Sequence, residues 1–150
     1  MTEQPFPEAD ANVVIMPNRD DLHCGEICPA GAAAAGVNAG PIRLLQGRQG
    51  RGGFGLAHMY EADRPKAIEG RGFQTPKDYA FAVAAGWTHL HLGVNGRITI
   101  AVECPGGMNA LVLHWQGQFW SIVTALPFRR PKEPLEFQKE RPDESEPRQR

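Results

Sequence analysis

Apolar and polar residues alternate along the second half of the chain, and this period of two is typical of β-strands that bury one face. The alternating segments are, in order, THLHLGV, RITIAVEC, ALVLHW and FWSIVTAL. Asn95-Gly96 joins the first two segments and is a strong hairpin signal, because both residue types accept the positive φ angles of a tight turn. The short turns PGGMN and QGQ separate the later segments, and Pro127 follows the last one. The pattern therefore predicts an antiparallel meander over residues 88–126.

Helices are expected before this meander. The clearest is TPKDYAFAVAAG, in which Thr75 can cap the helix, Pro76 suits its first position and Asp78 lies near its positive end. Two shorter helices are expected at GLAHMY and PKAIEG. The first would present an apolar stripe made of Leu56, Met59 and Tyr60.

These elements together predict an α+β fold in which N-terminal helices pack on one face of a small antiparallel β-sheet. A short strand at residues 42–45 begins the ordered domain, which we expect to cover residues 41–130. Residues 1–40 are expected to be a flexible, acidic, low-complexity segment, because glycines interrupt the alanine-rich stretch PAGAAAAGVNAG. Residues 131–150 are rich in proline and charge, which predicts a disordered tail.

The charges of the chain divide unevenly between these three parts. The net charge of the 150 residues is −1. Residues 1–40 carry one basic and six acidic side chains, residues 41–130 carry ten and five, and residues 131–150 carry five and six. The middle part is therefore basic, at +5, beside an N-terminal part at −5. A basic domain suits a polyanionic partner such as nucleic acid.

Cysteine usage and hydropathy narrow the class of protein. Three cysteines do not make a disulfide framework, which indicates a reduced, cytosol-type protein. His23, Cys24 and Cys28 supply fewer than the four ligands of a structural zinc site. No segment is apolar over the length that crosses a membrane, and the acidic N-terminus does not resemble a signal peptide. We therefore expect no metal, no other cofactor, no membrane association and a cytoplasmic location.

The stretch GRQGRGGFGLAH places a glycine-rich loop directly before a helix that carries His58. The amides of such a loop and the start of a helix form a surface that binds phosphate, to which arginines add charge. The candidate phosphate-binding residues are Arg48, Arg51, Gly52, Gly53 and Gly55. His58 can exchange a proton near neutral pH, so these are groups that RNA cleavage without a metal requires. The plainer interpretation is that His58 caps or packs its helix.

Residues 41–130 resemble the phage- and polymorphic-toxin-associated nucleases of the barnase/EndoU/colicin/RelE-like (BECR-fold) superfamily. Two patterns carry the resemblance: GFGLAHM at the start of the first helix and FWSIVTALP in the last strand. The resemblance implies a metal-independent endoribonuclease, a toxin-type effector that cleaves RNA through its 2′-OH and leaves a 2′,3′-cyclic phosphate. It also implies RNA such as tRNA as a partner, a cognate immunity or antitoxin protein, and action in the cytoplasm of the producing cell or of a target cell.

The same resemblance assigns roles to four residues. His58 matches the helix histidine that acts as acid or base, and Thr124 matches a hydroxyl residue that contacts phosphate or the 2′-OH. Arg97 and Arg129 match positions that stabilise phosphate. Many relatives carry a second basic pair with a histidine shortly after the first, whereas this chain has YEADRPK there. A second histidine would have to come from His89, His91 or His114, or the mechanism uses one.

Other interpretations stay open from the residues alone. GRQGRGG resembles a minimal RGG segment, which would make the chain a non-catalytic RNA-binding module that relies on Arg48 and Arg51. Transfer of ADP-ribose ranks below both functions, because a convincing Arg…Ser-Thr-Ser…Glu set is missing. Thr124 is also a β-branched residue that fills space in strands. His89 and His91 alternate with leucines and are expected on a solvent-exposed face.

Overall fold

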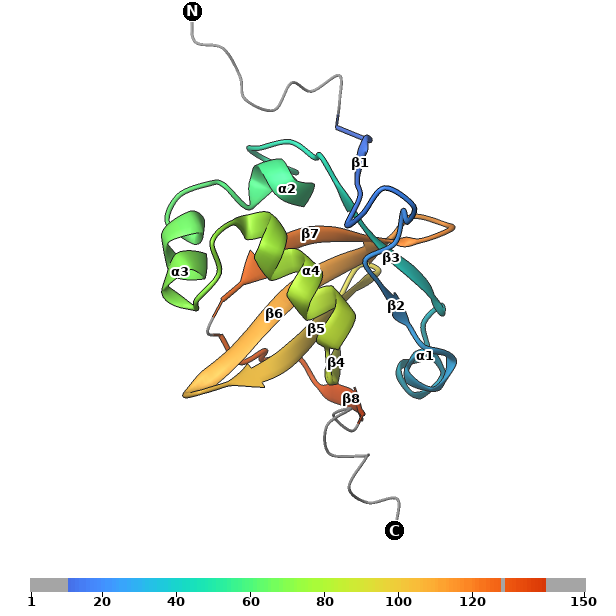
Figure 1. Cartoon of the computed structure of the whole chain (residues 1–150). Coiled ribbons are helices and arrows are strands. Elements are labelled where there is room, and N and C mark those ends of the chain that lie inside the picture. The colour runs from blue at the N-terminus through green and yellow to red at the C-terminus, as the bar shows by residue number, and fades with distance from the viewer. Residues whose placement is uncertain (1–10, 128, 140–150) are drawn as a thin grey trace, which may run out of the picture.

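The computed structural model describes residues 11–127 and 129–139 of the chain (Figure 1). In chain order, its elements are β1 (Val14–Ile15), β2 (Gly25–Ile27), α1 (Pro29–Ala35), β3 (Gly40–Leu45), α2 (Gly55–His58), α3 (Arg64–Gly70), α4 (Pro76–Gly86), β4 (His89–Leu92), β5 (Arg97–Cys104), β6 (Gly107–Trp115), β7 (Trp120–Leu126) and β8 (Leu135–Gln138). The predicted α+β class is confirmed, and so are the four meander strands from β4 to β7.

The described strands form one sheet in the order β1-β3-β7-β6-β5-β4-β8, with β2 also paired to β3. Neighbouring strands are antiparallel except β3 and β7, which pair in parallel with Ile42 opposite Trp120. The expected Asn95-Gly96 turn closes the β4–β5 hairpin, and both residues have positive φ angles, of 57° and 78°. β3 thus joins the N-terminal part of the chain to β7, the edge strand of the meander.

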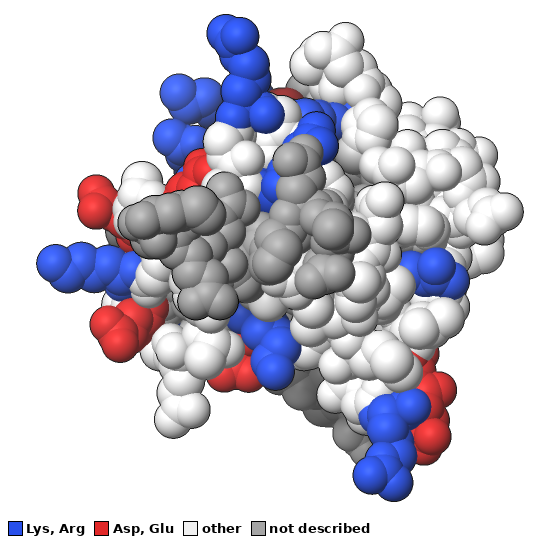
Figure 2. All heavy atoms as spheres, turned by 90° about the horizontal axis from the view of Figure 1, so that it is seen from above, with Lys and Arg blue, Asp and Glu red and all other residues white. Residues whose placement is uncertain are grey.

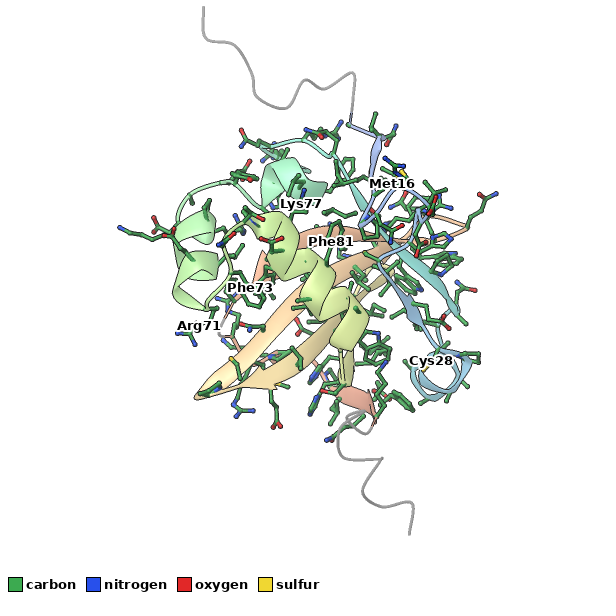
Figure 3. The ribbon with its side chains drawn as sticks, in the orientation of Figure 1. Met16, Cys28, Arg71, Phe73, Lys77 and Phe81 are labelled. Carbon is green, nitrogen blue, oxygen red and sulfur yellow. The ribbon has the colours of Figure 1, made fainter. Side chains whose placement is uncertain are left out.

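Helix α4 covers one face of this sheet, as Figure 1 shows. Its start agrees with the prediction, because the Thr75 hydroxyl accepts a hydrogen bond from the Asp78 amide at 3.1 Å. Its buried face includes Tyr79, whose hydroxyl donates to the Ala110 carbonyl of β6 at 3.0 Å. Phe73, labelled in Figure 3, stands edge-on against the Tyr79 ring with centroids 5.2 Å apart. The main core therefore lies between α4 and the sheet.

The alanine-rich stretch near the N-terminus is a helix, so the prediction of a low-complexity linker is wrong for Pro29–Ala35. Its glycines do not interrupt α1. Gly36 ends the helix in the left-handed conformation, at φ 71°, and Gly31 lets the helix approach the Phe137 ring, which a Cβ would meet at 3.1 Å. Ala32 and Ala35 are buried, so α1 contributes to the core although its side chains are small. The described part of residues 1–40 therefore contains three regular elements, β1, β2 and α1. The flexibility expected for this segment stays a prediction.

The beginning of the predicted tail also has regular structure. β8 pairs with β4, and Phe137 stands edge-on against Trp87 with centroids 6.2 Å apart. Phe137 anchors β8, but the proline-rich, charged composition around it did not indicate a strand. Residues 140–150 of the predicted tail lie outside the described residues.

Two glycines close the turn between β3 and α2. Gly47 has φ 73°, and a Cβ on it would lie 1.7 Å from the Phe54 carbonyl oxygen. Gly55 has φ 77°, and its Cβ would lie 2.5 Å from the Leu45 carbonyl oxygen. Backbone therefore packs directly on backbone here, and no larger residue fits. This contact explains part of the glycine content of the loop without any ligand.

Alanine at Gly55 should destabilise the fold more than alanine at Gly50. Gly50 also has a positive φ, 88°, but nothing lies within 4 Å of its Cβ position. Gly50→Ala should therefore cost only the left-handed backbone, about 1–2 kcal/mol, whereas Gly55→Ala should add roughly 1–3 kcal/mol of overpacking. Urea unfolding of both variants measures the difference, and equal losses would contradict the close backbone contact.

Candidate functional site

Two clefts lie side by side along β7. The first, which we call the loop cleft, has a volume of about 300 Å³, and the second, the α3 cleft, has a volume of about 360 Å³. The loop cleft is lined by Asn12, Leu45, Gly52, Gly53, Phe54, Arg97, His114, Gln116, Ser121 and Val123. The α3 cleft is lined by Ala62, Asp63, Arg64, Ala67, Ala125, Leu126, Pro127 and Arg129.

His58 and Thr124 line neither cleft, but each lies in a segment that lines both of them. The segment from Gly52 to Ala67 lines the loop cleft near its start and the α3 cleft near its end. Likewise, Ser121 and Val123 of β7 line the loop cleft, and the end of β7 with Pro127 lines the α3 cleft. α2 packs against β7, so the two segments run next to each other. His58 occupies the middle of one segment and Thr124 the middle of the other. The structure therefore brings together two regions that the sequence separates by more than sixty positions.

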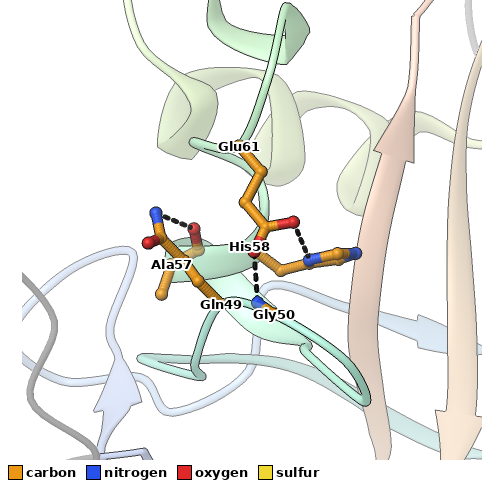
Figure 4. Close-up of polar contacts among 5 residues, drawn as sticks. All are labelled: Gln49, Gly50, Ala57, His58 and Glu61. Atoms are coloured by element: carbon orange, nitrogen blue, oxygen red, sulfur yellow. Dashed lines mark hydrogen bonds and ion pairs between the residues drawn. The ribbon is translucent and has the colours of Figure 1, made fainter.

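Glu61 holds the His58 ring from within the same turn of chain. Its carboxylate lies 3.2 Å from His58 Nδ1, a charge contact that falls short of a well-aligned hydrogen bond. The other carboxylate oxygen accepts a hydrogen bond from the Gly50 amide, as Figure 4 shows. Gly53 leaves room for the ring, because a Cβ there would lie 2.9 Å from His58 Nδ1. Loop and histidine are thus joined through one carboxylate.

The environment of His58 favours its neutral form. Burial is the largest cause that lowers the pKa of His58, and the positive charge of Arg64 comes next. The charge of Glu61 opposes the shift, and Arg97 adds to it. The side chain keeps 17% of its surface exposed. A neutral, reachable imidazole is the form that accepts a proton as a general base.

A row of polar side chains crosses the sheet beside this histidine. Arg97 of β5 is opposite His114 of β6, which is opposite Ser121 of β7, which is opposite Arg43 of β3. The first three line the loop cleft. Ser121 is 2% exposed, and its hydroxyl lacks a hydrogen-bond partner among the described residues. A buried hydroxyl without a partner at the wall of a cleft is available to a ligand.

An irregularity in β7 places Thr124 on the same face as Ser121. The β6–β7 register shifts between Val112 and Leu113, so that Thr124 is opposite Val112 while Ser121 is opposite His114. The Thr124 side chain is buried, and its hydroxyl also lacks a partner among the described residues. Thr124 therefore carries an unused polar group, which a residue that only fills space would not need.

The structure decides which further histidine can join His58. His114 lines the loop cleft, and its Nδ1 lies 3.0 Å from Gln116 Nε2. His89 and His91 lie on β4, which β5 and β6 separate from β7, a distance of roughly 14 Å at the usual strand spacing. Neither lines a cleft of this site. His114 is therefore the second histidine of the candidate site.

The expectation that His89 and His91 face solvent is wrong, because they are only 9% and 7% exposed. They lie on the sheet face opposite the leucines, as alternation predicts, but that face is covered. Residues 129–134, which lead to β8, pass behind the sheet in Figure 1, and His91 Nδ1 donates to the Glu133 carbonyl there at 3.0 Å. His89 Nδ1 lies 2.8 Å from the Thr88 hydroxyl. Both rings therefore have structural contacts.

The glycine and arginine loop is folded rather than open. Arg48 and Phe54 exchange backbone hydrogen bonds of 2.9 and 3.0 Å, and the Arg48 guanidinium lies over the Phe54 ring, 5.9 Å from its centroid. The Gly53 amide donates to the Gly50 carbonyl at 2.9 Å, so it is not free to bind phosphate. Gly55 is buried by its contact with Leu45. Of the predicted loop residues, Gly52 and Gly53 line the loop cleft, and Arg51 is exposed.

The two predicted arginines are not together. Arg97 lines the loop cleft, whereas Arg129 lines the α3 cleft with Arg64. Sequence reasoning missed Glu61 and Ser121, and it named His114 only as one of three possible second histidines. The i, i+3 spacing of His58 and Glu61 was a signal that could have identified Glu61. The placement of Ser121 and the choice of His114 depend on strand register.

The residues around Cys24 do not form an evident metal site. Burial raises the pKa of the Cys24 thiol to about 12, which opposes the thiolate form that binds metals. Among residues 11–127 and 129–139, no group of three or more His, Cys, Asp and Glu side chains is placed to hold a metal ion. In the same residues, no helix has the length and apolar character to cross a membrane.

His58 should titrate below its ordinary pKa of about 6.5, as followed by NMR. Arg97→Gln should raise this pKa, because a neighbouring positive charge is lost, and Glu61→Gln should lower it further. A pKa of His58 unchanged in both variants would contradict the described contacts.

The lowered pKa of His58 also affects the free energy of unfolding, which should decrease as the pH falls below about 6.5, because the unfolded chain binds a proton that folded His58 does not.

Comparison with known proteins adds no relative to this description. No protein-family model, curated protein or solved structure matches the chain. The geometry of its own residues is therefore what supports a function.

Proposed function

We propose that the protein is a metal-independent endoribonuclease related to the BECR-fold nucleases. One observation carries the proposal: His58, whose pKa is lowered by its surroundings, lies against Gly53, and Gly53 lines a cleft that also contains a second histidine, an arginine and a hydroxyl without a partner among the described residues. A base, an acid and a cation at one phosphate are the groups that RNA cleavage through the 2′-OH needs. The segment order and the two local patterns that resemble this superfamily agree with it.

In the proposed mechanism, His58 removes the proton from the 2′-OH of the substrate. The 2′-oxygen attacks the adjacent phosphorus, and the bond from phosphorus to the 5′-oxygen breaks. His114 donates the proton that the departing 5′-oxygen takes up, so the products are a 2′,3′-cyclic phosphate and a 5′-hydroxyl. Glu61 orients the His58 ring and stabilises it once protonated.

The remaining groups bind the substrate. Arg97 neutralises the charge that develops on the phosphate, and Ser121 and Thr124 offer hydroxyls to phosphate or ribose oxygens. Figure 2 shows Lys and Arg side chains mostly on the side of the molecule where α2 and α3 lie, mixed with Asp and Glu. Basic side chains gathered on one side suit RNA as substrate, and tRNA is one candidate. The proposal places cleavage in the cytoplasm of the producing cell or of a target cell.

The toxin-type role is part of the same proposal. It includes a cognate immunity or antitoxin protein that covers the clefts in the producing cell. The alternative of a non-catalytic RGG-type module has less support, because such segments bind RNA as open, adaptable chains and this loop is closed by its own hydrogen bonds.

The purified protein should cleave RNA in the presence of EDTA and leave cyclic phosphate ends. His58→Ala and His114→Ala should each lower kcat/KM about 100-fold or more, because each removes a proton-transfer group. His23→Ala is the matched control, since His23 lies outside both clefts and should leave cleavage unchanged. Salt-sensitive RNA binding without any cleavage would instead support the RNA-binding module.

A further inference from the structure

A separate hollow, which we call the α4 cavity, lies away from both clefts of the proposed cleavage site. Its volume is about 730 Å³, larger than either cleft, and it shares no lining residue with them. Its walls are β2 with the residues before it, the start of β3, the end of α4, Trp87 and Lys139. Gly25 lets β2 lie against the last turn of α4, since a Cβ there would clash with the Ala84 carbonyl. The size of the cavity suits a small organic molecule.

The walls of the α4 cavity favour a positively charged ligand. Asp21 and Glu26 contribute two carboxylates from exposed positions. The last turn of α4 also borders the cavity, and carbonyls at the end of a helix carry a partial negative charge. His23 adds no charge, because its Nδ1 accepts a hydrogen bond from Arg43 Nε at 3.3 Å. An anion would therefore meet repulsion here, whereas a cation is attracted.

A cation of the protein itself already occupies part of this cavity. Lys139 Nζ lies 3.9 Å from the centroid of the Trp87 ring, which is a cation–π contact. Trp87 Nε1 donates to the Glu26 carbonyl at 3.0 Å, so the ring is held in place. Burial is the largest cause that lowers the pKa of Lys139, and interaction with Cys28 and Glu26 opposes the shift. The Lys139 ammonium is therefore partly desolvated, and it regains water if another cation replaces it.

We infer that the α4 cavity binds an aliphatic polyamine, one ammonium group of which takes the place of Lys139 on the Trp87 ring. Lys139 brings one positive charge to a cavity with two carboxylates and a helix end. A chain with several ammonium groups matches these negative groups more completely. The inference goes beyond the proposed nuclease function and does not depend on it, because no residue of this cavity has a role in the proposed cleavage.

Titration of the full chain with spermidine tests the inference, followed by calorimetry and by the NMR signal of the Trp87 indole N–H. At physiological ionic strength, binding should be saturable and should shift the Trp87 signal, because the ammonium that lies over the ring is exchanged. 1,8-Octanediol has a similar length but no charge, and it should not bind. Absence of spermidine binding, or binding that leaves the Trp87 signal unchanged, would overturn the inference.

Glu26→Gln should weaken spermidine binding about fivefold, as expected for the loss of one partly exposed charge contact. Glu69→Gln is the matched control. Glu69 is an exposed carboxylate on α3 that does not line the cavity, so this variant should bind as the wild type does. Equal weakening in the two variants would show attraction to the overall charge of the protein rather than to a site, and would contradict the inference.

Lys139→Ala should strengthen spermidine binding about fivefold, because it uncovers the Trp87 ring and removes the competing ammonium. The Lys139 amide donates to the Thr88 carbonyl at 2.8 Å, and this backbone contact is kept in the variant. Lys139→Arg keeps a cation that can lie on the same ring and should bind as the wild type does. If Lys139→Ala unfolded in urea like the wild type but bound spermidine no more tightly, replacement of Lys139 by the ligand would be excluded.

Discussion

The close contact between the end of β3 and the start of α2 is the constraint on which the candidate site depends. Gly47 and Gly55 allow two stretches of backbone to meet where no side chain fits. This contact turns the chain back after β3 and sets α2 on β7. His58 then projects next to Gly53, and Glu61 reaches the Gly50 amide. The glycines therefore serve mainly to build the site, and only Gly52 and Gly53 border the cleft itself.

The two faces of the sheet bury different kinds of side chain. One face carries the apolar residues that pack under α4, including Ile100 and Leu111. The other face buries polar groups such as Thr99, Ser121 and Thr124, which costs stability unless they find partners. The hydroxyls of Ser121 and Thr124 lack hydrogen-bond partners among the described residues, a departure from full pairing of buried polar groups that is common at functional sites. The main apolar core and the candidate site therefore lie on opposite sides of the same strands.

Local signals predicted much of this architecture. The Thr75 cap and the Asn95-Gly96 turn were evident because each depends on a few adjacent residues. α1 was missed because glycines lie within and beside its alanines, although alanine favours helix and burial of Ala32 and Ala35 stabilises this one. β8 was missed because one aromatic residue anchors it. Tyr60 was expected in an apolar stripe, but α2 is only four residues long and leaves Tyr60 39% exposed. Tertiary packing decided each of these cases.

The site was less predictable, since its parts meet only through the sheet. His58 and Thr124 were predicted from local patterns and a family resemblance, but the packing of α2 against β7, which brings their segments together, is not a local property. The partnership of His114, Arg97 and Ser121 depends on strand register, and a shift of one residue would turn these side chains to the other face. Neither the hydrophobic periodicity nor the composition of the sequence specifies the register of the strands.

The parallel pairing of β3 with β7 has a consequence for how the protein is made. Ile42 pairs with Trp120, 78 positions later in the chain (120 minus 42), so this contact closes a long loop and depends on distant residues. During synthesis the first residues leave the ribosome well before β7 exists. Until then His58 has neither the strand that carries Thr124 nor the second wall of either cleft. Both clefts are therefore completed late in translation, and a chain that ends before β7 lacks them.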